Sequence, residues 1–278
     1  MPQIERLGVI AGSGDLPLEL AEAATRQGID VHVFVLRDQG DPAAYEGRFP
    51  TVTIRIGGAA EAMALVRAQG IRDIVFAGGV RRPSLKELMP DATATKILGR
   101  GLFRQGDDGL LRTVIRHLEE REDFRVHSIG AFLTEQKPSE GRLGSIDPPG
   151  HAQADIQRGI AILDALAPQD VGQAVVIQDG LVLGIEAIEG TEALLARCAT
   201  LRRDGPAATL VKLSKPMQTD RADLPAIGPD TIEQAKAAGL AGIAVEADRS
   251  LIISRDETIR RANEAGLFLI AIRRDDSE

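Results

Sequence analysis

Three short apolar runs in the first half of this sequence end in glycine, and amphipathic segments separate them. Runs of this length are typical of buried strands, and the segments between them have helical spacing. Strands that alternate with helices predict βαβ units and a parallel sheet. The runs lie at residues 7–11, 52–56 and 73–77, and they are followed by Gly12-Ser13-Gly14, Gly57-Gly58 and Gly78-Gly79.

These glycines are predicted to lie at the carboxyl edge of the sheet, where open α/β folds bind ligands. Backbone N–H groups at such a turn favour anions. We therefore expect Gly12, Ser13 and Gly79 to hold part of a nucleotide or a phosphate. The alternative is that the glycines only form turns. A dinucleotide fingerprint is matched in part, since Pro17 stands at its third glycine and Asp38 near its ribose-binding acid.

The second half of the sequence predicts another α/β domain. Apolar runs at residues 174–177 and 181–185 are joined through Asp179-Gly180, a pair typical of a tight hairpin. A hairpin beside strand–helix units implies a mixed sheet. Prolines and glycines between the halves, with little periodicity, are expected of a connection between domains. The predicted fold is α/β with a Rossmann-like N-terminal domain at residues 1–133, a linker at 134–149 and a mixed C-terminal domain at 150–278.

A second group of polar residues follows the hairpin. Glu186 and Glu189 can project where the strand ends, and Gly190 frees the backbone there. Thr191 is a natural N-cap for the next helix. A hydroxyl and N–H groups at a helix start can form a binding site for an anion. The alternative is a plain helix cap with exposed acids.

The stretch from Lys212 to Asp230 is the densest source of charge in the sequence, and its prolines predict a long ordered loop. Asp230, after Pro229, is interpreted as a helix N-cap. Cations beside carboxylates suit a phosphate-and-metal site, whereas the alternative is a solvated connection with surface ion pairs. The candidate residues here are Lys212, Lys215, Gln218, Asp220, Arg221 and Asp223.

Several kinds of chemistry are excluded by what the sequence lacks. A net charge of −8 disfavours nucleic acid as a partner, and one cysteine fits a reducing cytosol. The four histidines are scattered without zinc spacing, and neither a nucleophile elbow nor a P-loop is present. Cys198 is interpreted as a buried small residue. Carboxylates, lysines and glycine turns remain, and they fit Mg²⁺-assisted phosphoryl chemistry.

Several motifs together resemble the LpxI family over nearly the whole chain. The most specific lies in the charged loop, where Lys215-Pro216 precedes Gln218, Arg221 and Asp223-Leu224-Pro225. Two positions depart from the family pattern: Thr219 follows Gln218 where an acid is expected, and Glu192 follows Thr191 where aspartate is expected. Asp223 is therefore better matched than Asp220. The other motifs are Ala11-Gly12-Ser13-Gly14, Arg82-Pro83-Ser84, Gly106-Asp107-Asp108, Gly172-Gln173, and Glu186-Ala187 with Glu189-Gly190-Thr191.

The resemblance implies a UDP-2,3-diacylglucosamine pyrophosphatase of lipid A biosynthesis. Water would cleave the diphosphate to UMP and 2,3-diacylglucosamine 1-phosphate (lipid X), with Mg²⁺ or another divalent metal. It also implies two α/β domains, the second of them catalytic, with the substrate held between them. A lipid-linked UDP-sugar substrate implies a cytoplasmic protein peripheral to the inner membrane.

Chemical roles follow for the candidate residues. Asp223, with Asp220 in reserve, would bind the metal or orient the attacking water, while Lys215 and Arg221 would offset charge on the diphosphate. Substrate binding would fall to Gly12, Ser13, Gly79, Gly190, Thr191, Lys212 and Gln218. Two alternatives remain open: a protein that binds a UDP-sugar or lipid without catalysis, and an NAD(P)-dependent oxidoreductase.

Overall fold

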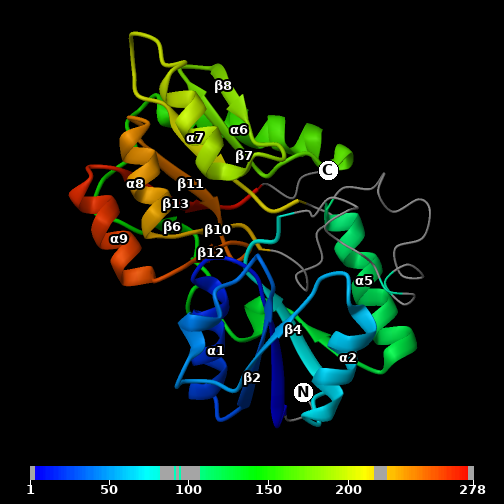
Figure 1. Ribbon diagram of the computed structural model, residues 1–278. Coiled ribbons are helices and arrows are strands. Elements are labelled where there is room, and N and C mark those ends of the chain that lie inside the picture. Colours follow the sequence, from blue (N-terminus) through cyan, green and yellow to red (C-terminus); the bar gives the residue numbers. More distant parts are fainter. Residues whose placement is uncertain (1–3, 82–90, 92–93, 95–106, 216–223, 275–278) are drawn as a thin grey trace. The chain divides into compact units, whose positions relative to one another are not determined.

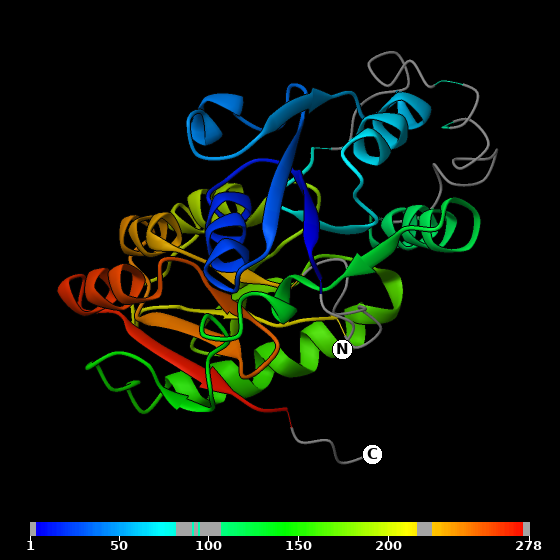
Figure 2. The same ribbon diagram turned by 90° about the horizontal axis from the view of Figure 1, so that it is seen from below.

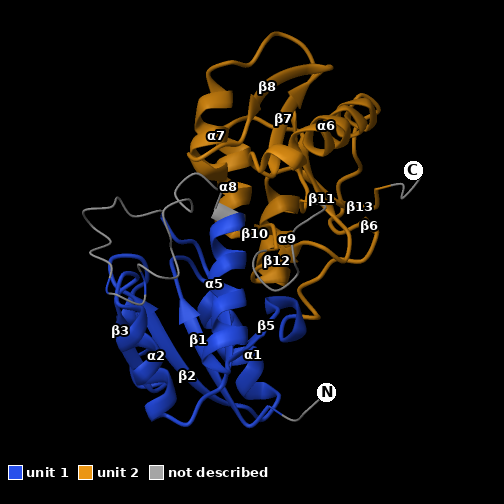
Figure 3. Ribbon diagram, turned by 90° about the vertical axis from the view of Figure 1, so that its right-hand side faces the viewer, with its two compact units in different colours: residues 1–133, 219–223 blue, residues 134–218, 224–278 orange. Residues whose placement is uncertain are grey.

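The computed structural model describes residues 4–81, 91, 94, 107–215 and 224–274. The described chain forms two compact units, which meet in the sequence between Leu133 and Thr134 (Figure 3). No helix in these described ranges is both long and apolar enough to cross a membrane.

The first unit is built on a five-stranded sheet in which every strand is parallel to its neighbours. The strand order, β3-β2-β1-β4-β5, is that of a doubly wound fold. The structure thus confirms the predicted Rossmann-like parallel sheet. Its strands are β1 (Arg6–Ala11), β2 (Asp30–Leu36), β3 (Thr51–Ile54), β4 (Asp73–Ala77) and β5 (Arg125–His127).

Helices cover both faces of this sheet (Figure 1). On one face α1 (Leu16–Arg26) packs against the central strands; Pro17 lies in its first turn and Gly28, at φ +83°, follows its end. On the other face, α2 (Ala59–Ala68) and α5 (Asp107–Glu122) pack against apolar side chains of β1, β2 and β4. Short 3₁₀ helices lie at η1 (Pro42–Tyr45) and η3 (Ile129–Ala131).

The second unit is built on a six-stranded mixed sheet with the order β6-β13-β11-β9-β7-β8. Strands β9, β11 and β13 are parallel, whereas β6, β7 and β8 pair antiparallel with their neighbours, which confirms the predicted hairpin and mixed sheet. The strands are β6 (Gly141–Arg142), β7 (Ala174–Gln178), β8 (Leu181–Ile185), β9 (Thr209–Lys212), β11 (Gly242–Glu246) and β13 (Phe268–Ile272). A separate two-stranded sheet pairs β10 (Ala226–Ile227) with β12 (Leu251–Ile252).

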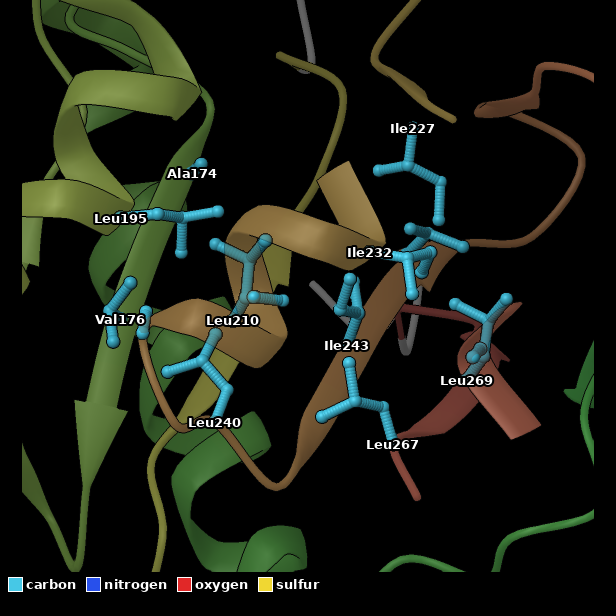
Figure 4. Packing of buried hydrophobic residues seen from close by; sticks show 14 of the residues in the cluster. Ala174, Val176, Leu195, Leu210, Ile227, Ile232, Leu240, Ile243, Leu267 and Leu269 are labelled. Atoms are coloured by element: carbon cyan, nitrogen blue, oxygen red, sulfur yellow. The ribbon is translucent and has the colours of Figure 1, made fainter. Parts of the chain in front are cut away.

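The core of this unit follows the period of two along each strand. Val175 and Ile177 face α6 (Ala152–Leu166), which is followed by η4 (Ala167–Gln169), while Ala174 and Val176 face the opposite layer. That layer consists of α7 (Gly190–Ala199), α8 (Pro229–Ala237) and α9 (Arg255–Glu264), as Figure 2 shows. Figure 4 shows the apolar side chains between these helices and the sheet. Each fully buried aliphatic side chain contributes roughly 1.5–3 kcal/mol.

Residues 134–149, predicted to be a linker, lie within the second unit. The Ile252 N–H donates to the Gln136 carbonyl at 2.9 Å, and the Asp248 N–H donates to the Pro138 carbonyl at 2.8 Å. Strand β6 then joins the edge of the main sheet beside β13. The prolines suggested a connection because they exclude a central strand, but they are compatible with a sheet edge.

Candidate functional site

The carboxyl edge of the second sheet gathers most of the buried polar side chains of this unit. Strands β9 and β11 end there, at Lys212 and Glu246, and β8 ends there before Glu186. These three side chains belong to residues that are only 7%, 5% and 6% exposed. Most buried polar groups in proteins have hydrogen-bond partners. Their partners define two clusters at this edge.

The first, called the Lys212 cluster, consists of Gln173, Glu186, Thr191 and Lys212. The Lys212 ammonium donates to Thr191 Oγ1 at 2.9 Å and to the carbonyl of Ala226 at 3.0 Å. The Thr191 hydroxyl in turn donates to Glu186 Oε1 at 2.6 Å. The other Glu186 oxygen accepts the N–H of Gln173 at 3.0 Å. Lys212 and Glu186 are therefore linked through one hydroxyl.

Thr191 is not the N-cap that the sequence suggested. Helix α7 begins one residue earlier, at Gly190, and Glu189 occupies the cap position. Gly190 takes φ +79°, a conformation that suits glycine. The hydroxyl of Thr191 donates to Glu186 instead, and a hydrogen bond to a carboxylate is stronger than one between neutral groups. The start of α7 and the Lys212 ammonium together place positive charge beside this turn.

The turn before α7 is held by Glu189. Its carboxylate accepts the N–H of Ala187 at 3.1 Å and Arg197 Nη2 at 2.7 Å. The same Arg197 nitrogen donates to the carbonyl of Ile185 at 3.0 Å. Hydrogen bonds from the backbone and from Arg197 hold the pKa of Glu189 below its usual value. Glu189 thus stays ionised and fixes the turn.

Lys215 lies three residues beyond the end of β9. Its ammonium forms an ion pair with Asp170, and the two side chains are 17% and 23% exposed. Asp170 takes a left-handed conformation, φ +55°, directly after η4. The pair brings a second lysine of the charged loop to the same sheet edge as Lys212.

The second cluster, called the Glu246 cluster, consists of Ser214, Glu246, Arg274 and Asp164. Glu246 Oε2 accepts the N–H of Ser214 at 2.8 Å and its hydroxyl at 2.6 Å. Arg274 donates to both oxygens of Glu246, at 2.9 and 2.7 Å. A third nitrogen of Arg274 donates to Asp164 at 2.7 Å. Sequence reasoning missed this cluster, although the rule that parallel strands end at one edge would have found Glu246.

In the first unit, the predicted glycine turns form a close bridge. The N–H of Ser13 donates to the Gly79 carbonyl at 2.8 Å, and the N–H of Gly79 donates back at 3.0 Å. The N–H of Gly12 donates to Ala77 at 2.8 Å. These three N–H groups therefore have partners within the protein. An anion at this turn would have to rely on the next N–H groups, at the start of α1.

Close approach explains why these positions are glycine. A Cβ on Gly12 would lie 2.3 Å from the carbonyl oxygen of Gly79. A Cβ on Gly78 would lie 2.5 Å from the Ser13 carbonyl oxygen, and Gly78 also has φ +88°. These close contacts support in part the alternative hypothesis that the glycines only form turns.

Part of the predicted charged loop lies outside the described residues: Gln218, Asp220, Arg221 and Asp223. Of the part that is described, Ala226–Ile227 forms β10 rather than loop. Asp230 is not the helix cap that was predicted. Helix α8 begins at Pro229, Gly228 occupies the cap position, and the Gly228 N–H donates to Thr231 Oγ1 at 3.2 Å.

The fold and the described residues define a class of protein: a two-unit α/β protein with a charged, hydrogen-bonded edge on its second sheet. Sequence comparison then narrows this class. Residues 6–136 match the LpxI N-terminal domain and residues 139–270 match the LpxI C-terminal domain. A UDP-2,3-diacylglucosamine pyrophosphatase LpxI from Caulobacter vibrioides is 38% identical over 277 residues, which cover 97% of this chain and 98% of that protein. The chain belongs to the LpxI family.

Two solved structures show weaker similarity. A glycinamide-RNase-transformylase T from Mycobacterium tuberculosis is 16% identical at a TM-score of 0.24, over 66% of this chain and 43% of that one. An isoflavone reductase is 9% identical at a TM-score of 0.28, over 99% of this chain and 80% of that one. At these TM-scores the two structures carry no information on the function of this chain.

Proposed function

We propose that this chain hydrolyses the diphosphate of UDP-2,3-diacylglucosamine to UMP and 2,3-diacylglucosamine 1-phosphate, a step of lipid A biosynthesis. The observation that supports this most strongly is the similarity to the Caulobacter protein named UDP-2,3-diacylglucosamine pyrophosphatase LpxI. The two chains are 38% identical over almost their full lengths. The charged edge of the second sheet is compatible with such a substrate, because a diphosphate needs cations and oriented donors.

The reaction is a substitution at phosphorus. The oxygen of a water molecule forms a new bond to one phosphorus as the bond between that phosphorus and the bridging oxygen breaks. The water releases a proton to solvent, and the bridging oxygen leaves with the other phosphate. We assign Asp223 to orienting this water, and Lys215 and Arg221 to offsetting the charge that builds up on the phosphate oxygens.

The remaining binding roles fall to both units. Lys212, with Gly190 and Thr191, would bind a phosphate or sugar oxygen at the start of α7, and Gln218 would add a donor. Gly12, Ser13 and Gly79 would contribute from the first unit through the helix start beside their bridge. The hydroxyl of Ser13, on an exposed residue, donates to the Gly79 carbonyl at 3.0 Å and keeps lone pairs for a ligand donor.

A divalent metal, which we take to be Mg²⁺, completes the proposal, with Asp223 and Asp220 as its protein ligands. Within the described ranges, no three His, Cys, Asp or Glu side chains are grouped so that they could hold a metal. Mg²⁺ nevertheless needs only one or two carboxylates, since substrate phosphates and water supply its other ligands. When bound, the ion would neutralise charge on the phosphates.

The substrate also implies where the protein works. Two acyl chains hold a UDP-diacylglucosamine in a membrane, so the protein would act in the cytoplasm, peripheral to the inner membrane. Flotation of the protein with vesicles that contain the substrate, compared with vesicles that lack it, would test this association.

The decisive experiment incubates the purified protein with UDP-2,3-diacylglucosamine and Mg²⁺ and measures UMP. Asp223→Ala should abolish UMP release while substrate binding is largely retained. Asp230→Ala is the matched control, because Asp230 is an exposed residue on α8. Release of UMP by Asp223→Ala at near the parent rate would refute the role of Asp223. Binding of the substrate without UMP release by the parent protein would refute hydrolysis altogether.

A further inference from the structure

The Glu246 cluster lies where the charged loop leaves the sheet. Ser214 directly precedes Lys215, two residues beyond the end of β9, and it is 2% exposed. Its N–H and hydroxyl both donate to Glu246 Oε2. Its carbonyl accepts Arg274 Nη2 at 2.6 Å. Every polar group of Ser214 is thus fixed by the same ion pair.

The ion pair is itself fixed from three elements. Glu246 is the last residue of β11, and Arg274 follows β13. Asp164 of α6 accepts a hydrogen bond from Nη1 of Arg274. Burial lowers the pKa of Arg274, but its hydrogen bonds to Glu246 and Asp164 outweigh that effect and raise it. The guanidinium therefore remains charged at neutral pH.

Stability alone is a poor reason for such a cluster. Two charges buried together contribute little more than apolar side chains of the same volume, because each loses its water. The cluster fixes the course of the chain as it leaves β9, because the backbone of Ser214 cannot shift without breaking a hydrogen bond. The next residue is Lys215, whose ammonium pairs with Asp170 at the same edge.

We propose that Glu246 and Arg274 are positioning residues for Lys215. They act through Ser214 and hold the lysine where it can offset charge on the diphosphate. This inference rests on the proposed function, in which Lys215 contacts the substrate. A misplacement of about 1 Å at a reacting group can lower turnover by about a hundredfold.

Glu246→Gln is the first test, because the side chain keeps its size while one acceptor oxygen becomes a donor. We expect kcat to fall by at least about tenfold, with KM changed much less. Arg273→Gln is the matched control: Arg273 neighbours Arg274, but its side chain is 60% exposed and it pairs with Glu140 and Asp248. If folded Glu246→Gln keeps the kcat of the control, the proposal is refuted.

A double-mutant cycle tests whether Glu246 acts through Lys215. If it does, Glu246→Gln should lower kcat little further in a Lys215→Met background, because the group being positioned is already gone. Independent effects would add in the logarithm of kcat. Additive losses would therefore refute positioning and leave Glu246 a structural residue. If Glu246→Gln does not fold, Arg274→Lys and Ser214→Ala enter the same cycle, with the same two outcomes.

A readout without turnover separates this inference from the proposed function. The chain has only six lysines, at positions 86, 96, 137, 212, 215 and 236, so reductive ¹³C-methylation gives few NMR signals. The Lys215 signal is assigned by its loss in Lys215→Arg. We expect Glu246→Gln to shift that signal and leave the Lys236 signal in place. An unshifted Lys215 signal refutes the positioning role, whether or not the parent protein releases UMP.

Discussion

Replacing Lys212 by methionine tests the Lys212 cluster most directly. Methionine keeps most of the aliphatic stem and removes the ammonium. The ammonium donates to Thr191 Oγ1 at 2.9 Å and to the Ala226 carbonyl at 3.0 Å, in a residue 7% exposed. The variant therefore loses two hydrogen bonds from a charged donor and one buried charge.

These losses act in opposite directions on stability. Each hydrogen bond from a charged group contributes about 1.5–3 kcal/mol. Removing the charge also removes a desolvation cost of several kcal/mol. We expect the net change in the free energy of unfolding to stay within about 3 kcal/mol, which lowers the melting temperature by less than about 12 °C.

Turnover should change far more than stability. Loss of one preorganised donor to a developing negative charge costs about 10²- to 10³-fold in kcat. UMP release gives kcat, and differential scanning fluorimetry gives the melting temperature. Lys236→Met, on the exposed side of α8, is the control. A folded Lys212→Met protein with kcat within about threefold of the parent would show that Lys212 does not act on the substrate.

Four further outcomes are expected. Gly12→Ala should lower the free energy of unfolding, measured by urea titration, by about 1–3 kcal/mol, because its Cβ would lie 2.3 Å from the Gly79 carbonyl oxygen. Gly150→Ala is the control and should leave this free energy unchanged, because a Cβ there meets no atom within 4 Å. Burial alone would raise the pKa of Asp73, but hydrogen bonds from Arg125 and His127 outweigh it and hold that pKa below its usual value. Its carboxylate therefore stabilises the protein above the unfolded pKa of about 3.9 and loses this effect as the pH falls through the folded pKa; Asp73→Asn should be less stable at pH 7 and approach the parent in acid, whereas a constant difference would contradict this. Burial raises the pKa of the Cys198 thiol, so a disulfide reagent should modify it only on unfolding, and rapid modification of the native protein would disprove its burial. Removal of divalent metal with EDTA should stop UMP release and Mg²⁺ should restore it; undiminished release would rule out the metal.

Much of the fold could be predicted from local patterns. The first unit follows from apolar runs that end in glycine, and the hairpin follows from Asp179-Gly180, whose residues both take positive φ. The two-residue strands β6 and β10 could not be predicted in this way. Two residues carry no period, so their pairing depends on distant strands that supply the hydrogen-bond partners.

Part of the candidate site could be placed from the sequence, whereas its contacts could not. Lys212 and Lys215 do reach the sheet edge, because a strand delivers both of them. The Thr191 hydroxyl could accept an N–H at a helix start or donate to a buried carboxylate, and only the tertiary fold decides between them. Glu246 and Arg274 are 28 residues apart, so no local pattern joins them.

The cations at the described sheet edge already have acidic or hydroxyl partners, and this affects how the edge can bind a diphosphate. Lys215 pairs with Asp170 and Arg274 pairs with Glu246, while Lys212 reaches Glu186 through a hydroxyl. Such cations already have partners before any ligand arrives, so Lys215 can offset charge on a diphosphate only from a fixed position. A diphosphate brings negative charge on both phosphates, and further positive charge must meet it. The start of α7, Arg221 and a divalent metal are the sources that the proposed mechanism provides. The hydrogen-bonded edge then orients the diphosphate, and these sources add to the charge that Lys215 offsets.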